Sequence, residues 1–185
     1  MFMQDATRFD FDAATVVERD AAPSTGLTAD TLIETAAGWR AAHTLRIGTS
    51  VFTLEGGSRP VLALDRQVLE AGRTLVRLPG GCFDNCSDLD LLPEQDVVLE
   101  CRGVRLIRIP ARMLAGHRGA RLVRLERAVE VVAPLFAEDE VVWTNSGTRL
   151  YCAGIRQGLT PGFVPRLDGA DADAALDRMT ARRTA

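Results

Sequence analysis

The sequence predicts an all-β domain of short antiparallel strands and hairpins. Many short segments alternate apolar and polar residues with a period of two, as half-buried strands do. Turn residues recur at intervals of roughly 8 to 12 positions, which is typical of a β-sandwich or barrel. A chain of 185 residues can build one sizeable core and is too short for two comfortable domains.

Strands are predicted first in the N-terminal half of the chain. "TLIET" (31–35) alternates apolar and polar positions, and "TLRIGTSVFTL" (44–54) gives two short runs around Gly48. "RPVLALDRQVLEAGRTLVRL" (59–78) indicates two strands around Glu70-Ala71-Gly72, a loop of hairpin length.

The second half continues the same pattern. "DVVLECRGVRLIRI" (96–109) predicts a hairpin that turns at Arg102-Gly103. "ARLVRLERAVEVVAPLF" (120–136) and "DEVVWTNSGTRLYC" (139–152) supply the last strands, with a tight turn at Asn145-Ser146-Gly147. "PARMLAG" (110–116) places Pro at a helix start and Gly at its end, so a short helical turn is expected at 110–115. The expected core positions are Val51, Leu62, Val76, Val98, Ile107, Val131 and Val142.

Two segments flank the predicted β domain of residues 26–152. Residues 1–25 are polar and turn-rich, and are expected to form a loosely attached lead-in. Residues 153–185 are first rich in Pro and Gly and then offer "ADADAALDRMTARR", a helix candidate with acidic residues early and arginines late. Its only large apolar residues are Leu176 and Met179, so we expect a frayed surface tail.

Composition limits the classes of function. A net charge of -3 leaves no excess of basic residues for a nucleic-acid-binding face. No apolar run approaches the roughly 18 residues of a membrane helix. Acidic residues stand at the N-terminus where a signal peptide would carry positive charge. We therefore expect a soluble, cytoplasmic protein with no nucleic-acid or membrane partner, although export by another route stays open.

The chain has four cysteines and two histidines. The cysteines are Cys82, Cys86, Cys101 and Cys152. The pair in "CFDNCSD" has C-x3-C spacing, and neither His43 nor His117 stands where it would complete a zinc site. We expect plain, partly buried thiols, a loop at 82–86, and no metal or cofactor. A disulfide or metal clip between Cys82 and Cys86 is the alternative.

Three blocks of the sequence resemble the Hint domain, the fold shared by hedgehog autoprocessing domains and inteins. They are "GLTADTLIETAAGWRAAHTLRIGTSVFTLEGGSRPVLAL" (26–64), "LLPEQDVVLECRGVRLIRIPARML" (91–114) and "APLFAEDEVVWTNSG" (133–147). The resemblance is strongest to the bacterial stand-alone type found in secreted calcium-binding-repeat proteins, and it implies a Hint-like β fold. The positions that fit are Thr31, Leu45, Arg46, Gly48, Val51, Thr53, Pro93, Val97, Leu99, Pro110 and Ala111.

The resemblance also implies a chemistry for which this chain lacks the reacting groups. In Hint domains the thiol of the first residue attacks the preceding carbonyl, and a histidine of the second block protonates the departing amine. Those positions hold Gly26, which has no side chain, and Gln95, which cannot transfer a proton near neutral pH. Thr49 replaces the usual Asp, and the His-Asn pair that ends inteins is missing. The sequence therefore predicts a degenerate active site and no cleavage.

Four neighbours are weak candidates to substitute for the lost groups. Thr25 and Thr28 carry hydroxyls, which are weaker nucleophiles than a thiolate and need an adjacent base. Asp30 and Asp96 would approach one another if the blocks pack as in the family, and a carboxylate pair can do acid–base work. The favoured interpretation is that these polar residues arose by chance after the reacting groups were lost, and that they have no catalytic role. Both histidines are expected in exposed loops.

The favoured function is a binding or assembly module whose emptied cleft or sheet edge engages a protein or peptide, for instance by strand addition. The alternative is a residual self-processing Hint domain with a substitute nucleophile, and a weaker one is a redox or metal role for Cys82 and Cys86. Fold resemblance alone cannot decide between these functions, because function depends on the site.

If the resemblance holds, the backbones of Gly26 and Gln95 approach within roughly 10 Å. Gly26→Cys with Gln95→His would then restore slow cleavage before residue 26.

Overall fold

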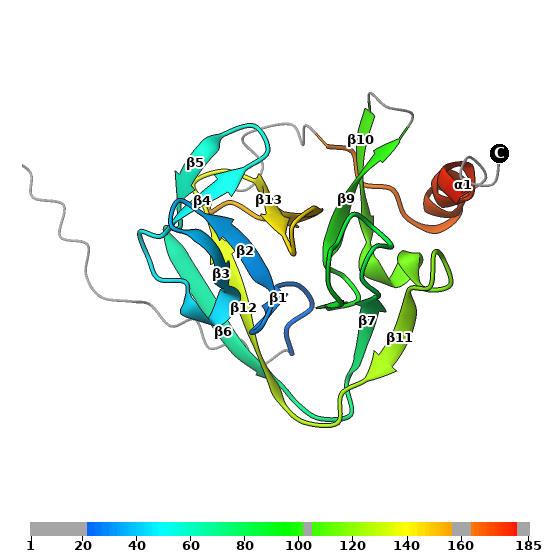
Figure 1. Ribbon diagram of the computed structural model, residues 1–185, viewed down its shortest axis with the longest axis horizontal. Coiled ribbons are helices and arrows are strands. Elements are labelled where there is room, and N and C mark those ends of the chain that lie inside the picture. The colour runs from blue at the N-terminus through cyan, green and yellow to red at the C-terminus, as the bar shows by residue number, and fades with distance from the viewer. Residues whose placement is uncertain (1–21, 102–104, 157–163, 181–185) are drawn as a thin grey trace, which may run out of the picture.

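The computed structural model describes residues 22–101, 105–156 and 164–180 (Figure 1). The first half contains β1 (Leu27–Thr28), β2 (Leu32–Thr35), β3 (Gly38–Ala41), the 3-10 turn η1 (Ala42–Thr44), β4 (Ser50–Thr53), β5 (Gly57–Pro60), β6 (Ala63–Leu69), β7 (Thr74–Leu78) and β8 (Leu89–Leu91). The second half contains β9 (Asp96–Cys101), β10 (Arg105–Pro110), the 3-10 turn η2 (Ala111–Leu114), β11 (Arg121–Arg124), β12 (Val129–Leu135), β13 (Glu140–Thr144), β14 (Thr148–Cys152) and helix α1 (Gly169–Thr180). The all-β prediction is confirmed, as is the helical turn after Pro110.

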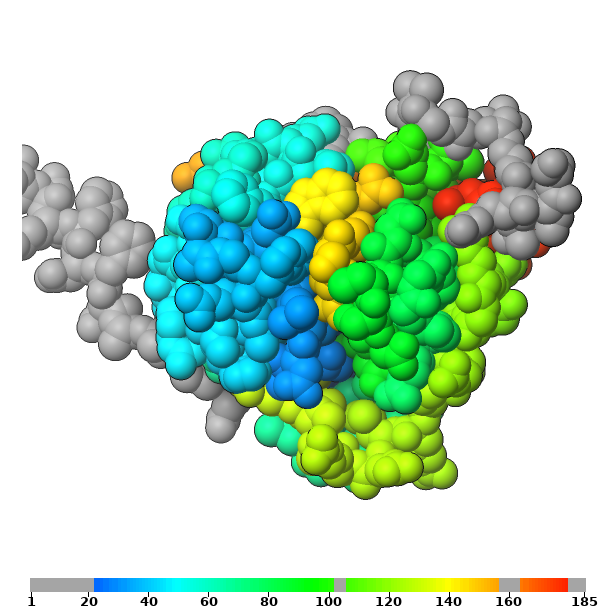
Figure 2. All heavy atoms as spheres, in the orientation of Figure 1, coloured from blue at the N-terminus to red at the C-terminus, as the bar shows by residue number. Residues whose placement is uncertain are grey.

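The strands form two antiparallel sheets. One has the order β11-β7-β8-β1-β12-β6, and the other has the order β10-β9-β14-β13-β2-β4-β5 with β3 beside β2. In the space-filling view, the yellow strands near residue 140 lie between the blue and cyan first third of the chain and its green middle (Figure 2). Strand β1 is central in its sheet, because Leu27 pairs with Leu91 on one side and Val132 on the other. This pairing brings the first and second sequence blocks together.

The core positions expected from the sequence are buried in six of seven cases: Val51, Val76, Val98, Ile107, Val131 and Val142. The exception is Leu62, which is 43% exposed, whereas its neighbour Val61 is fully buried. Leu62 precedes the first residue of β6 and lies in the connection from β5, so the alternation of β6 does not extend to it.

Two of the three expected hairpins form. Strands β9 and β10 pair antiparallel, although residues 102–103 of the expected turn lie outside the described part. Strands β13 and β14 also pair, across a turn in which Asn145 and Ser146 have φ of 43° and 73°. Both values are in the left-handed region that tight hairpin turns require.

The hairpin expected at 59–78 is wrong in its pairing, although both strands exist. β6 pairs with β12, and β7 pairs with β8 and β11. The loop between β6 and β7 pairs instead with the connection from β11 to β12, where Gly72 N–H donates to Leu125 O at 2.8 Å. Figure 1 shows both connections running together at one end of the molecule. A short loop permits a hairpin but does not require one.

The expected strand at 44–47 is also absent. Thr44 belongs to η1, where Leu45 N–H donates to Ala42 O, and residues 45–47 lie outside any strand. Leu45 is buried, but the carbonyls of this segment accept hydrogen bonds from side chains, such as that of Arg66 to Leu45 O. The apolar run is therefore an anchored turn rather than a paired strand.

Helix α1 corrects the expectation of a frayed tail. Ala172, Ala175 and Leu176 are buried in the main core, and Met179 packs against it. Their spacing of three and four residues makes one helical face, and the two small alanines allow close approach, so few large apolar residues are needed. No helix among the described residues is long and apolar enough to cross a membrane. Of the lead-in, only residues 22–25 are described.

Candidate functional site

A cleft of about 340 Å³ lies at the start of β1. It is lined by residues 22–27, 94–96, 133–135 and 151–153, together with Asp65 and Gln67. These residues come from the lead-in, the turn before β9, and strands β6, β12 and β14. The sheet pairings around β1 thus assemble the cleft from segments far apart in the sequence.

Gly26 and Gln95 face each other in this cleft. The Gly26 N–H donates a hydrogen bond to Gln95 Oε1 at 2.9 Å, across a sequence separation of 69 residues. The expected proximity of the two positions is therefore confirmed. The other end of the buried Gln95 amide donates to Tyr151 O at 2.8 Å and to Asp96 O at 3.2 Å. Gln95 thus ties the start of β1 to the end of β14.

The backbone at Gly26 strongly favours glycine. Its φ of +130° is a conformation that residues with a side chain rarely adopt. A Cβ at this position would lie 2.6 Å from Val131 Cγ1 and 3.4 Å from Val132 O. Because Val131 is itself buried, it has little room to move aside. The position therefore lacks both a thiol and the space for one.

Only two of the four substitute candidates lie in the cleft. Thr25 is exposed and lines it, and Asp96 forms part of its wall. The Thr28 hydroxyl donates to Asp90 O outside the cleft, and Asp30 lines a separate hollow beside β7 and β11. The structure does not bring Asp30 to Asp96, so the two do not form a carboxylate pair.

Neither histidine lines the cleft. His43 is exposed in η1, as expected, and its Nδ1 lies 2.9 Å from Ala29 O. His117 follows η2 and is half-buried rather than fully exposed. Thr25 therefore has no imidazole beside it in the cleft to act as a base.

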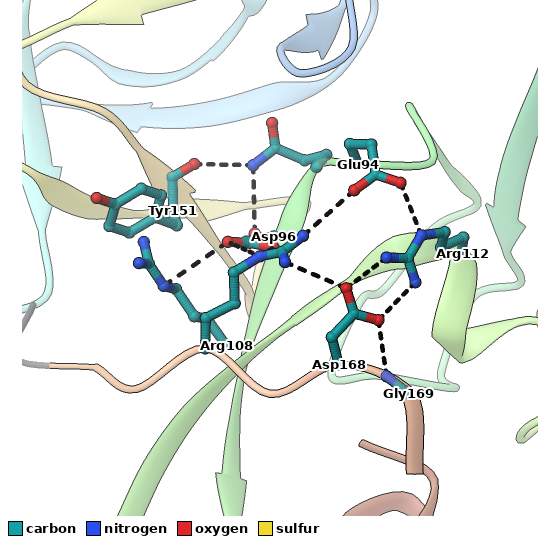
Figure 3. A network of polar contacts seen from close by, with 9 residues as sticks. Glu94, Asp96, Arg108, Arg112, Tyr151, Asp168 and Gly169 are labelled. Carbon is teal, nitrogen blue, oxygen red and sulfur yellow. Dashed lines mark hydrogen bonds and ion pairs between the residues drawn. The ribbon is translucent and has the colours of Figure 1, made fainter. Parts of the chain in front are cut away.

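The two carboxylates that flank Gln95 are held by arginines from the C-terminal half. Arg166 Nε lies 2.9 Å from Asp96 Oδ1, and Arg166 Nη2 lies 3.2 Å from Glu94 Oε2. Arg112 Nε contacts Glu94 Oε1 at 2.7 Å (Figure 3). These side chains form a network of ion pairs and not a free acid–base pair.

Cys152 is a cleft residue that the sequence did not indicate. It ends β14 and reaches the cleft through the pairing of β14 with β9, a long-range contact with no local sequence signal. Burial, with a smaller contribution from the charge of Glu140, raises the pKa of the Cys152 thiol to about 12. At neutral pH the thiol is protonated and a poor nucleophile.

We expect Cys152 to resist alkylation in the folded chain. With iodoacetamide at pH 8, the exposed Cys86 should be modified at least about tenfold faster than Cys152, because only an accessible thiolate reacts. Peptide mapping by mass spectrometry measures both rates, and the urea-unfolded chain, in which they should converge, is the control. Equal rates in the folded chain would contradict the buried, protonated state.

The 82–86 segment is a loop, as expected, and the cysteines are free thiols. Cys82 is buried, which raises its pKa, whereas Cys86 is exposed with its Sγ 3.1 Å from Ser146 Oγ. The residues that the structure describes contain no cluster of three or more side chains able to hold a metal ion.

Comparisons with known proteins identify a family. A family model described as the Hint domain matches residues 25–148. No curated protein matches the chain. Among solved structures, the chain is similar to a bacterial intein-like domain from Clostridium thermocellum, with 15% identity over 72% of this chain and 100% of that one and a TM-score of 0.49. It is also similar to the gp41-1 intein (10% identity, 71% and 100% covered, TM-score 0.46) and the MchDnaB-1 intein (13% identity, 66% and 98% covered, TM-score 0.45).

Proposed function

The chain belongs to the Hint domain family, and from this membership we propose that it is a non-cleaving member that acts as a binding or assembly module. The hydrogen bond from Gly26 N–H to Gln95 Oε1 is the observation that carries the proposal. It supports the proposal because it joins the two residues that the resemblance aligns with the family's nucleophile and proton donor.

The geometry of this pair argues against cleavage at the Thr25–Gly26 bond. Gln95 accepts a hydrogen bond from the Gly26 nitrogen, which would become the leaving amine on cleavage. Protonation of that amine needs an acid instead of an acceptor. Thr25 has a hydroxyl in the cleft but no imidazole beside it. Cys152 is buried and protonated. Among the cleft residues that the structure describes, the alternative of residual self-processing therefore finds no activated nucleophile and no histidine to act as the acid.

The cleft itself supports a role in binding. Its volume of about 340 Å³ is within the usual range for sites that hold small ligands or a few peptide residues. Residues 22–25 line the cleft, so a stretch of chain forms part of its wall and could pair with a bound peptide. We infer that its partner is a peptide or protein segment.

Selection from a displayed random-peptide library tests this function. Peptides retained by the native chain should lose binding to the variant Ala133→Trp, which fills the cleft with a large ring. Leu122→Trp is the matched control, because Leu122 is 59% exposed on β11 and does not line the cleft.

The outcome is read by comparing the three proteins. Peptides that bind the native chain and Leu122→Trp equally, and bind Ala133→Trp at least about tenfold more weakly, support a cleft partner. If no peptide is retained, or if all retained peptides bind Ala133→Trp equally well, the cleft is not the binding site.

A further inference from the structure

A short strap, residues 164–168, attaches to the outside of the cleft wall. It follows the segment matched by the family model, which ends at residue 148. Arg108 N–H donates to Pro165 O and Leu167 N–H donates to Arg108 O, both at 2.9 Å, so the strap adds a parallel bridge to the edge of β10. Val164 is buried against Val98 and Val141.

Ion pairs attach this strap to the turn that carries Gln95. Arg166 contacts Asp96 at 2.9 Å and Glu94 at 3.2 Å, and Arg112 joins Glu94 to Asp168 (Figure 3). The Arg112 guanidinium beside it, and the Gly169 N–H, hold the pKa of Asp168 well below its usual range, so it stays charged at neutral pH. Because Glu94 and Asp96 flank Gln95, these contacts also fix the amide that binds Gly26.

Arg108 offers Asp96 a second partner. Its guanidinium stacks 4.1 Å from the centroid of the Tyr151 ring, and its buried Nε has no hydrogen-bond partner among the described residues. That Nε lies only 3.7 Å from Asp96 Oδ2. The Asp96 side chain is 10% exposed, so without Arg166 this nearly buried charge depends on Arg108 as its remaining ion-pair partner. A small movement of Arg108 would shorten that contact to a hydrogen bond.

We propose that the strap is a latch for the cleft, which opens when Asp96 passes from Arg166 to Arg108. In the closed state Arg166 holds the turn and Arg108 rests on Tyr151. In the open state Arg108 leaves the ring of Tyr151. The carbonyl of the same residue accepts a hydrogen bond from the Gln95 amide, so this movement also loosens the hydrogen bond between Gln95 and Gly26. The inference rests on the proposed function, because it assigns regulation to the same cleft. A peptide that binds the open state better would shift the chain toward it.

The latch is suited to respond to ionic strength. The side chains of Arg166, Glu94 and Asp168 are 36%, 42% and 39% exposed, so salt screens their attraction. The Gln95 amide and the Gly26 N–H are buried and respond only through the movement of the turn. Added salt should therefore favour the open state.

Hydrogen exchange at the Gly26 amide, followed by NMR, tests the coupling. Arg166→Met should speed exchange at the Gly26 amide by about tenfold, because this amide exchanges whenever the turn that carries Gln95 opens locally. The amide of Val142 in the core should keep its protection. Arg59→Met is the matched control, because it removes the Arg59–Glu140 ion pair, whose residues lie on β5 and β13 in the sheet that does not contain β1. Arg166→Lys keeps the charge but cannot bridge three carboxylates, and should give a smaller acceleration.

A double replacement tests the exchange of partners. Arg108→Met with Arg166→Met should lower stability by much more than the two single changes added together, because no other arginine of the described segments contacts Asp96. Unchanged Gly26 exchange in both Arg166 variants, or simple additivity in the double variant, would overturn the latch. Failure of the proposed function would show separately, as absent peptide binding with the Gly26 coupling intact.

Discussion

Replacing Gly26 by cysteine is expected to lower the free energy of unfolding by about 3 kcal/mol, the sum of backbone strain and overpacking. The φ of +130° is strained for any residue with a Cβ, and that atom would meet Val131 Cγ1 at 2.6 Å. Urea unfolding measures the loss. Thr25→Cys is the control, because it introduces the same thiol at an exposed neighbour and should cost little.

The same geometry argues against the restored cleavage that the family resemblance implied. Gly26→Cys with Gln95→His should yield a destabilised chain that remains uncleaved, because the thiol cannot enter without displacing β12. Native stability in Gly26→Cys, or thiol-dependent cleavage in the double variant, would show that the site relaxes more easily than its packing indicates.

Gln95→Leu should also cost about 3 kcal/mol, because it leaves the buried Gly26 N–H and the Tyr151 carbonyl without their partner at roughly 1–3 kcal/mol each. Leucine preserves the side-chain volume, so the loss reports the hydrogen bonds. Gln67→Leu is the matched control. Among the residues that the structure describes, the Gln67 amide bonds only to the half-buried Asp65 carboxylate within the same strand, and its loss should cost about 0.5 kcal/mol. Equal losses in both variants would show that Gln95 does not tie the cleft together.

Much of the fold was predictable because strand alternation is a local signal. The hairpins β9–β10 and β13–β14 follow from their apolar periodicity and turn residues. The distant pairing of β6 with β12 has no such signal, so a loop of hairpin length at 70–72 suggested the wrong partner. The docking of α1 was missed because its buried face is made mainly of alanine, which looks weakly apolar in sequence.

The candidate site was predictable only in part. The order of the family blocks placed Gly26 near Gln95, and the hydrogen bond between them confirms it. The positive φ at Gly26, the arrival of Cys152 through β14, and the grip of Arg166 on Asp96 all depend on tertiary packing. None of the three leaves a pattern in neighbouring residues.

The mass of the intact 185-residue chain, followed for several days after purification with and without added thiol, tests whether the chain cleaves itself before Gly26. Because Gly26 has neither a thiol nor room for one, and Gln95 cannot donate a proton to the leaving amine, we expect the unchanged full-length mass under both conditions. A fragment that begins at Gly26, growing with time or with thiol, would contradict it.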